Sequence, residues 1–334
     1  KTEIQAAMQK ALQNNAAEDF QKPVISLSTS YLQRKFAGDG YAMLQEAADM
    51  GFEYVELGHS TTMGTMDGIE RAVKEGVVKV SSLHNFCPVP PFAKGAAPNL
   101  FSPATRNALE SRQWRRHTSN TLEFARMFGA KAVVCHCGEL SYFFRRPDSK
   151  IAAILDEKGY EGLESADGYL KLVEKFKKKA ARRSEKRDYK NIAKNISALH
   201  EIAEEIGVFF GLENREAYPE LPLDWNIAAF FEALRDLPRA KFWHDVGHSK
   251  RKELARIYTQ MELAECTADI VCGWHLHDCS ESGKDHVAIG KGCIDFKAIS
   301  KFFDAKRHIF TLELNRAVER SDAVDSLKRV QDML

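Results

Sequence analysis

The chain alternates short runs of β-branched and aromatic residues with longer stretches in which apolar residues recur at helical spacing. Each run is bounded by a polar turn, as is typical of a buried strand followed by an amphipathic helix. Strands are predicted at residues 24–29, 54–57, 78–84, 132–136, 208–213, 241–245, 270–275 and 308–313, and helices at 41–50, 114–128, 192–206, 227–234 and 296–303. Eight strands alternating with helices predict an α/β fold, a (β/α)8 TIM barrel.

The length of 334 residues exceeds the roughly 250 that such a barrel needs. The excess is assigned to an amino-terminal helical extension, residues 1–22, and to a basic helical insertion after the fourth strand, about residues 139–190. No linker divides the remainder, so residues 23–334 are predicted to form one domain. An open doubly wound sheet is the main alternative, but it would normally carry a Gly-rich turn after its first strand, and residues 28–32 do not.

Charge and composition limit the classes of binding partner that this protein is expected to have. The formal net charge of +1 offers no general attraction for nucleic acid, although the basic insertion leaves a local phosphate contact open. No apolar run approaches the roughly 20 residues of a membrane span, so no membrane partner is expected. Seven scattered cysteines fit reduced thiols and a cytoplasmic protein, with Cys135 and Cys137 assigned to the core. The sequence is compatible with a homo-oligomer.

Acids and histidines stand at the carboxyl ends of the third to eighth predicted strands. In chain order they are His84, His136, Glu213, Asp245, His275 and Glu313. In a parallel barrel these ends meet at one rim, where carboxylates and imidazoles from different strands can hold a divalent metal with positions left for substrate. A single strand-end histidine is more often structural, but six such residues in register indicate a shared site.

The motifs around these residues resemble the xylose-isomerase-like TIM barrels, a superfamily that includes endonuclease IV. They are Gly129 to Gly138 with His136, Leu212-Glu213-Asn214-Arg215, Asp245-Val246-Gly247-His248, His275-Leu276-His277-Asp278, His286 to Gly292, and Leu312-Glu313-Leu314-Asn315. The match runs from Val24 onward and omits the amino-terminal helix and the basic insertion.

In the isomerase and epimerase branch, the resemblance implies one Mn²⁺, Zn²⁺, Co²⁺ or Mg²⁺ ion held by the residues matching Glu213, Asp245, His275 and Glu313. The expected substrate is a sugar, sugar phosphate or polyol, converted through a metal-stabilised enediolate with Glu213 and Glu313 as the acid/base pair. The candidate substrate-binding residues are His248, Arg215, Arg316, Phe86 and Trp274, although Arg215 and Arg316 could equally pair with neighbouring acids.

The endonuclease branch implies a phosphodiester hydrolase with three zinc ions, and this is the first alternative. His84 and His136 match ligands of one zinc, with Glu213 bridging, and His248 and His286 match ligands of another. Lys284 stands where that zinc's aspartate is expected, so one or two ions are predicted rather than three, unless a shifted loop lets Asp285 compensate. A sugar-binding barrel without catalysis is the third hypothesis.

Four other polar residues near these motifs have open or structural roles. Strand alternation places His277 on the same side as His275, where it competes as a ligand, and turns His244 to the outside of the barrel. Glu56 and His59 end the second strand, where a hydrogen bond to substrate and simple loop polarity are equally compatible with the sequence.

Overall fold

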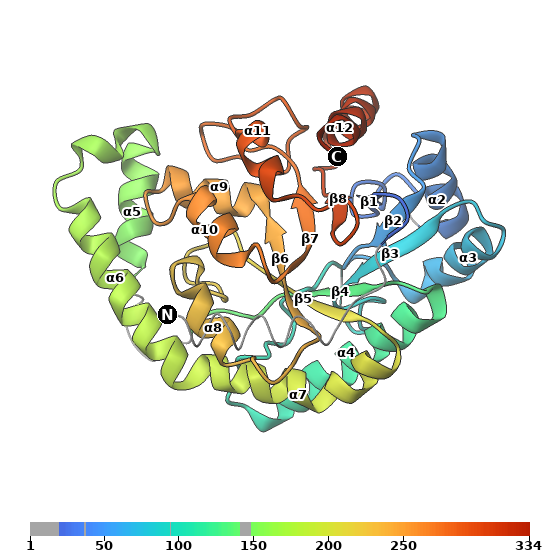
Figure 1. Ribbon diagram of the computed structural model, residues 1–334, viewed down its shortest axis with the longest axis horizontal. Helices are drawn as coiled ribbons and strands as arrows, with labels where there is room; N and C mark the ends of the chain where they lie inside the picture. Colours follow the sequence, from blue (N-terminus) through green and yellow to red (C-terminus); the bar gives the residue numbers. More distant parts are fainter. Residues whose placement is uncertain (1–19, 37, 94, 141–147) are drawn as a thin grey trace.

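A computed structural model describes residues 20–36, 38–93, 95–140 and 148–334. Eight parallel strands close into a barrel in sequence order (Figure 1). They are β1 (Val24–Ser28), β2 (Tyr54–Leu57), β3 (Lys79–His84), β4 (Ala132–Cys135), β5 (Phe209–Glu213), β6 (Ala240–Asp245), β7 (Val271–Leu276) and β8 (Ile309–Leu312). The predicted barrel is therefore confirmed, with each strand end within one residue of its expected place. Most of the predicted extension, residues 1–22, lies outside the described residues.

Helices cover the outside of the barrel (Figure 1). They are α2 (Gly40–Asp49), α3 (Met63–Lys74), α4 (Ala108–Phe128), α7 (Tyr189–Glu205), α8 (Ile227–Glu232), α9 (Val246–Leu254), α10 (Gln260–Thr267), α11 (Phe296–Ile299) and α12 (Arg320–Met333). All five predicted helices are present. Helix α4 begins six residues before its predicted start, because the Asn107 side chain accepts hydrogen bonds from the N–H groups of Leu109 and Glu110 and so caps a turn that lacks apolar periodicity.

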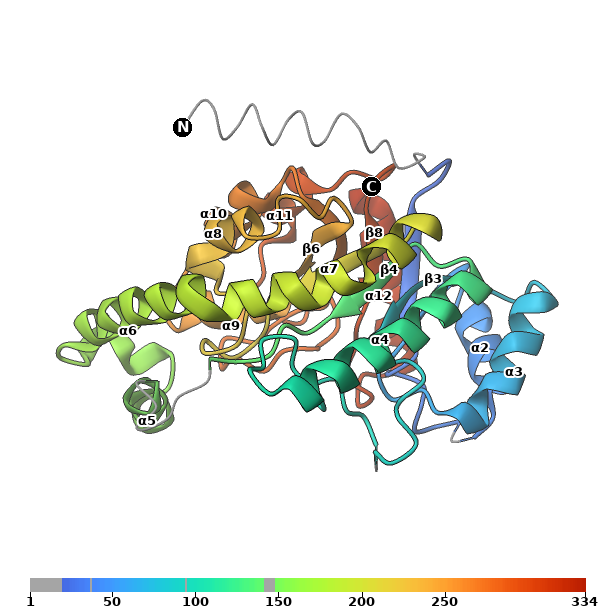
Figure 2. The same cartoon turned by 90° about the horizontal axis from the view of Figure 1, so that it is seen from below.

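The insertion after β4 is helical, as predicted, in its described part. It contains α5 (Ser149–Lys158), the 3₁₀ turn η1 (Glu161–Ser165), α6 (Tyr169–Arg183) and the π turn η2 (Ser184–Asp188), which leads directly into α7 (Figure 2). Helix α6 buries Val173, Phe176 and Ala180, whereas Lys171 and Lys175 are exposed. Most of its cations therefore lie on a solvated face. Among the helices described, none is long and apolar enough to cross a membrane.

The buried hydrophobic residues form two clusters. Cys135 and Cys137 are buried in the larger core, which also contains helix residues, as predicted for both thiols. A smaller cluster joins Trp243 to residues of other strands, including Val24, Ala132 and Ile309. The Trp243 ring stands 5.3 Å from the His275 ring, centroid to centroid, so this smaller cluster lies next to the histidine that the sequence places at the metal site.

Glycines make room for the Trp243 side chain. A methyl group at Gly211 would lie 2.8 Å from Trp243 Cε3, and one at Gly273 would overlap the Trp243 ring. We therefore expect Gly273→Ala to lower the free energy of unfolding by about 1–3 kcal/mol through overpacking. Gly64→Ala is the matched control, because only Thr62 Oγ1, at 3.8 Å, approaches its added methyl group. Urea unfolding measures both, and equal stability of the two variants would contradict the packing.

Candidate metal centre

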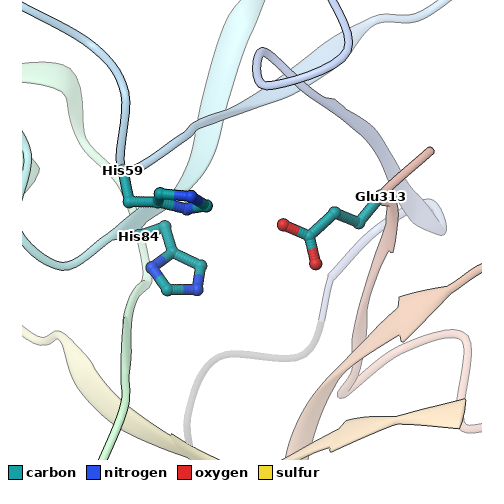
Figure 3. Close-up of side chains that lie close together, drawn as sticks. All are labelled: His59, His84 and Glu313. Carbon is teal, nitrogen blue, oxygen red and sulfur yellow. The ribbon is translucent and has the colours of Figure 1, made fainter. Parts of the chain in front are cut away.

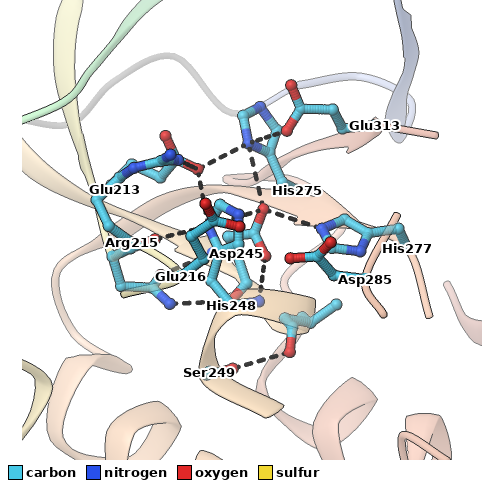
Figure 4. A network of polar contacts seen from close by, with 12 residues as sticks. Glu213, Arg215, Glu216, Asp245, His248, Ser249, His275, His277, Asp285 and Glu313 are labelled. Atoms are coloured by element: carbon cyan, nitrogen blue, oxygen red, sulfur yellow. Dashed lines mark hydrogen bonds and ion pairs between the residues drawn. The ribbon is translucent and has the colours of Figure 1, made fainter. Parts of the chain in front are cut away.

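Imidazoles and carboxylates from the carboxyl ends of the strands come close enough to share cations (Figures 3 and 4). One group consists of Glu213, Asp245, His275 and Glu313, each offering an atom within 4.8 Å of the others. His275 Nδ1 lies 3.1 Å from Glu313 Oε2, 3.4 Å from Glu213 Oε1 and 3.8 Å from Asp245 Oδ2. The structure thus brings together the four residues predicted as primary ligands, from β5, β6, β7 and β8.

The charge of this group suits a cation. All four side chains are buried, and three of them are carboxylates. Burial alone would lower the pKa of His275, but Glu313 and Glu56 raise it well above its usual value. Within this group the three carboxylates outnumber the single imidazole, and oxygen and nitrogen donors in this ratio fit a divalent metal.

Glu56 contacts the nitrogen of His275 that faces away from the three carboxylates. Its carboxylate is fully buried at the end of β2, accepts a hydrogen bond from Ser82 Oγ at 2.8 Å, and lies 3.1 Å from His275 Nε2. This contact would hold a proton on Nε2 when a cation is bound, which leaves Nδ1, the nitrogen that faces the three carboxylates, as the ligand atom. The sequence left the role of Glu56 undecided, although an acid inside a buried strand was a usable signal.

We expect Glu56→Gln to weaken metal binding about 10- to 100-fold, because the neutral amide holds the imidazole less firmly in its ligating orientation. Calorimetric titration of the apoprotein with Mn²⁺ or Co²⁺ measures the change. Glu53→Gln is the control, since Glu53 is exposed and pairs with Lys79 at 2.8 Å on the outside. Equal affinities for the two variants would rule out the positioning role.

His277 orients Asp245. The His286 N–H donates to His277 Nδ1 at 2.8 Å, so His277 Nε2 carries the proton and donates to Asp245 Oδ2 at 3.0 Å. The His248 N–H donates to the other Asp245 oxygen at 2.7 Å. A methyl group at Gly247 would overlap the His277 ring, so glycine is required beside it. His277 therefore lies on the ligand side, as alternation predicts, but it contacts a ligand and belongs to none of the described ligand groups.

A second group is formed by His84, His136 and Glu213. Glu213 Oε2 lies 3.4 Å from His84 Nε2 and 3.1 Å from His136 Nε2. His136 Nδ1 is 2.7 Å from Asn99 Oδ1, which assigns the proton to Nδ1 and leaves Nε2 as a lone pair facing a carboxylate oxygen. Neither His136 Nε2 nor Glu213 Oε2 has a hydrogen-bond partner in the described chain. Two ligands about 2.1 Å from one cation, at right angles, lie about 3 Å apart, so this spacing fits a metal.

Arg215 binds the ligand Glu213 directly. Its Nη1 lies 3.2 Å from Glu213 Oε1, and its Nε lies 3.6 Å from Glu220 Oε1. Burial would raise the pKa of Glu213, but Arg215 and the histidine His136 lower it well below its usual value. The structure thus places Arg215, a candidate substrate contact, against the carboxylate of a predicted metal ligand.

A third set of donors centres on His248. It forms one group with Asp245 and His286 and another with Glu216 and Asp285. Lys284 is exposed, and the Asp285 carboxylate faces this set instead, so the loop has the shift that lets Asp285 compensate.

The positive charge beside this third set of donors comes from the Arg251 side chain, since Lys284 is exposed. Arg251 Nη1 lies 2.6 Å from Glu216 Oε2 and 3.2 Å from Asp285 Oδ2. Two of the carboxylates that could hold a third ion are therefore already paired with a guanidinium. One or two ions rather than three stays a prediction, and Arg251 adds a second physical reason for it beside the one drawn from Lys284.

Asp278 holds the loop that carries Asp285 and His286. Its carboxylate accepts N–H groups from Gly290 at 2.9 Å, Gly292 at 3.0 Å and Ile294 at 3.1 Å. Within this loop His286 has φ +55°, a left-handed conformation that is uncommon for residues other than glycine. Carboxylate bonds to several backbone groups therefore fix the position of His286 beside Glu313, 3.5 Å from Nε2 to Oε2.

The remaining predicted substrate contacts lie elsewhere. Phe86 is buried and packs edge-on against Phe101, with centroids 5.9 Å apart. Trp274 stacks on His244 at 4.6 Å and donates through Nε1 to His308, so alternation along β7 turns it away from the ligand His275. Arg316 is exposed after β8, and within the described residues no contact joins it to the ligands. Of the five predicted contacts, His248 and Arg215 lie at the centre.

Comparison with known proteins relates most of the barrel, from the second strand onward, to one family. The model of the xylose isomerase-like TIM barrel family matches residues 44–333. An uncharacterized protein of Methanocaldococcus jannaschii is 28% identical over 142 residues, which are 42% of this chain and 53% of that protein. The chain thus matches about half the length of this curated relative.

Solved structures with a similar fold include sugar epimerases. The 3-keto-D-glucoside 4-epimerase YcjR from Escherichia coli has a TM-score of 0.63 at 15% identity, covering 93% of this chain and all 100% of that one. A D-tagatose 3-epimerase-like protein has a TM-score of 0.58 at 16% identity over 93% of this chain and 96% of its own. The IolI protein with a bound zinc atom has a TM-score of 0.57 at 13% identity, with coverages of 93% and 97%. At these identities the likeness shows the fold.

Proposed function

The chain belongs to the xylose isomerase-like TIM barrel family, and from this premise we propose that it is a divalent-metal-dependent isomerase or epimerase of a sugar, sugar phosphate or polyol. The observation that carries the proposal is the buried group of Glu213, Asp245, His275 and Glu313. The epimerase names of the structural neighbours support the same reaction class. The expected partner is a small carbohydrate.

Glu213, Asp245, His275 and Glu313 would hold the metal, since their donors fit a divalent cation. When bound, such a cation polarises a substrate carbonyl and makes the neighbouring C–H more acidic. Burial would raise the pKa of Glu313, but His275 and His286 lower it well below its usual value. The pKa of Glu213 is also lowered, mainly by Arg215 against the effect of burial. Both carboxylates are therefore ionised at neutral pH and able to accept a proton.

The two carboxylates come from strands three positions apart in the ring of eight, β5 and β8. Removal of the proton beside the carbonyl leaves an enediolate. If the carboxylate that took the proton returns it to the former carbonyl carbon, and the proton of the neighbouring hydroxyl passes to the former carbonyl oxygen, the product is an isomer. If the other carboxylate protonates the opposite face of the same carbon, the product is an epimer.

Proton exchange tests the reaction class. Protein reconstituted with Mn²⁺ or Co²⁺ is incubated in D₂O with ketopentoses, ketohexoses and their phosphates, and NMR follows the C–H signals beside the carbonyl. We expect deuterium at one of these carbons together with a new sugar. Tight binding of a sugar without exchange would instead support the non-catalytic binding barrel.

Phosphodiester hydrolysis of the endonuclease-IV type is a second candidate. It is favoured by one observation, the convergence of His84 and His136 on Glu213, which a mononuclear epimerase does not need. Zinc-loaded protein and abasic duplex DNA provide the test. Strand cleavage with three zinc ions per chain would replace the epimerase proposal, and absence of cleavage alongside sugar exchange would support it.

A further inference from the structure

His59 has a buried ring nitrogen that no group in the described part of the chain satisfies. It lies two residues beyond the end of β2, and its Nδ1 has no hydrogen-bond partner in the described chain. A buried polar atom without a partner costs free energy, so a ligand is expected where one persists in an ordered site. The sequence left this residue undecided between loop polarity and a hydrogen bond to substrate.

The backbone around His59 is held firmly. The N–H of Gly58 donates to Thr29 Oγ1 at 2.9 Å, and the N–H of Thr61 donates to the carbonyl of Gly58 at 3.0 Å. The carbonyl of Thr61 in turn accepts the N–H of Val89 at 2.7 Å. These bonds tie the loop after β2 to the loops after β1 and β3. The imidazole is thus presented from a fixed backbone, as a ligand requires.

The free nitrogen of His59 lies among other metal-binding donors. His59, His84 and Glu313 each offer a ligand atom within 4.8 Å of the other two (Figure 3). The two imidazole rings meet edge to face with centroids 4.8 Å apart. In the described chain, the ion pairs of Glu313 all run from Oε2, to His275 and His286. Its Oε1 remains for a separate partner.

We propose that His59 is a ligand of a second divalent cation, which it holds together with His84 and Glu313 beside the primary site. Two imidazoles and one carboxylate favour Zn²⁺ or Co²⁺ over Mg²⁺, which prefers oxygen ligands. Three protein ligands also leave an open position, as in metal sites that bind water or substrate.

This second cation adjoins the primary one through Glu313, which belongs to both ligand groups. His84 is also shared, with the group of His136 and Glu213. His84 Nδ1 lies 3.2 Å from the backbone carbonyl oxygen of the next residue, Asn85. Because only the other nitrogen, Nε2, faces the carboxylates, His84 can bind one ion. The second cation would therefore bind His84 through Nε2. His59 Nδ1, which has no hydrogen-bond partner in the described chain, supplies its other imidazole ligand.

The inference goes beyond the proposed function, because it concerns the number and ligands of the cations and holds for either reaction. Apoprotein is titrated with Co²⁺ under calorimetry and visible absorption, which count the ions and report their nitrogen ligands. We expect two classes of site in the unaltered protein. In His59→Ala the second class should weaken at least about 10-fold, and the first should persist.

Two further variants assign the classes. Asp245→Asn should weaken the first class, since Asp245 belongs to the primary group. His200→Ala is the matched histidine control, because His200 lies on α7 and pairs with Glu204 at 3.6 Å. It should leave both classes unchanged. In unaltered protein labelled with ¹⁵N-histidine, the ring nitrogens of His59 should shift when the second equivalent of Zn²⁺ is added, so the proposal is testable even if His59→Ala does not fold.

The outcomes separate cleanly. Loss of the second class in His59→Ala, or the ¹⁵N shift at His59, supports the site. A second class that survives in folded His59→Ala, a single equivalent of Co²⁺ in the unaltered protein, or a His59 spectrum unmoved by Zn²⁺ overturns it. Failure of the proposed function would look different: both cations would bind, and no sugar would exchange its protons.

Discussion

Glu313→Gln should reduce kcat for sugar interconversion by about 10²- to 10⁴-fold, the usual contribution of a positioned acid/base group. The glutamine keeps the size of the side chain and an oxygen ligand but cannot accept a proton. Glu313 is buried, lies 3.1 Å from His275 Nδ1 and is held ionised by its histidine neighbours, which lower its pKa. Deuterium wash-in at the carbon beside the carbonyl should fall in parallel with turnover.

The metal content of Glu313→Gln must be measured beside its activity, because Glu313 is also in the primary ligand group. A large loss of exchange with the primary cation still bound identifies an acid/base role. Glu319→Gln is the control, since Glu319 is exposed six residues farther along the chain. A Glu313→Gln protein that exchanges protons at the normal rate would falsify the assignment and move the acid/base role to other groups.

Removal of the metal should abolish turnover and lower the melting temperature. A divalent Lewis acid contributes several kcal/mol to such a reaction, which corresponds to a fall in rate of about 10³-fold when it is lost. The folded protein also loses the stabilisation of a bound ion, about 2.7 kcal/mol when the free ion stands at 100 times its dissociation constant. Without the ion, the buried carboxylates of Glu213, Asp245 and Glu313 face one another around His275.

Dialysis against a chelator, followed by readdition of Mn²⁺, Co²⁺, Zn²⁺ or Mg²⁺, measures both effects. Turnover and melting temperature should recover together with the ion that fits the site. Asp245→Asn is the internal control: if its primary site no longer binds at the ion concentration used, the chelator can remove only the proposed second cation, so its melting temperature should fall less than that of the unaltered protein. Chelated protein that is free of metal by elemental analysis and retains full turnover would exclude a metal-dependent reaction.

The barrel was readable from the sequence because its signal is local and repeated. Each buried strand is an apolar run of a few residues, and each covering helix repeats its apolar positions at helical spacing. The helix starts were less accurate, as at α4, where the cap formed by Asn107 lies outside the periodic stretch. The rim of ligands was also predictable, because parallel strands in a barrel place all their carboxyl ends on one side.

Alternation along a strand predicted which side of the sheet a residue faces, but it did not predict which residue it contacts there. His277 was correctly placed on the side of His275, yet only the fold shows that it binds Asp245 at 3.0 Å. The same holds for Glu56, whose partner His275 is 219 positions away in the chain. Hydrogen-bond partners that come from different strands are set by the register of the closed sheet, which no local pattern encodes.

What the sequence by itself determined is therefore the architecture and the residue types at its rim. Strand and helix periodicity follow from the burial of one face of each element, and that information is local. The tertiary structure decided the electrostatics: Arg215 is paired with Glu213, and Arg251, rather than Lys284, neutralises the carboxylates beside His248. It also left His59 Nδ1 without a hydrogen-bond partner among the residues that the structure describes. These outcomes depend on the distances between loops after different strands, and such distances exist only once the barrel has closed.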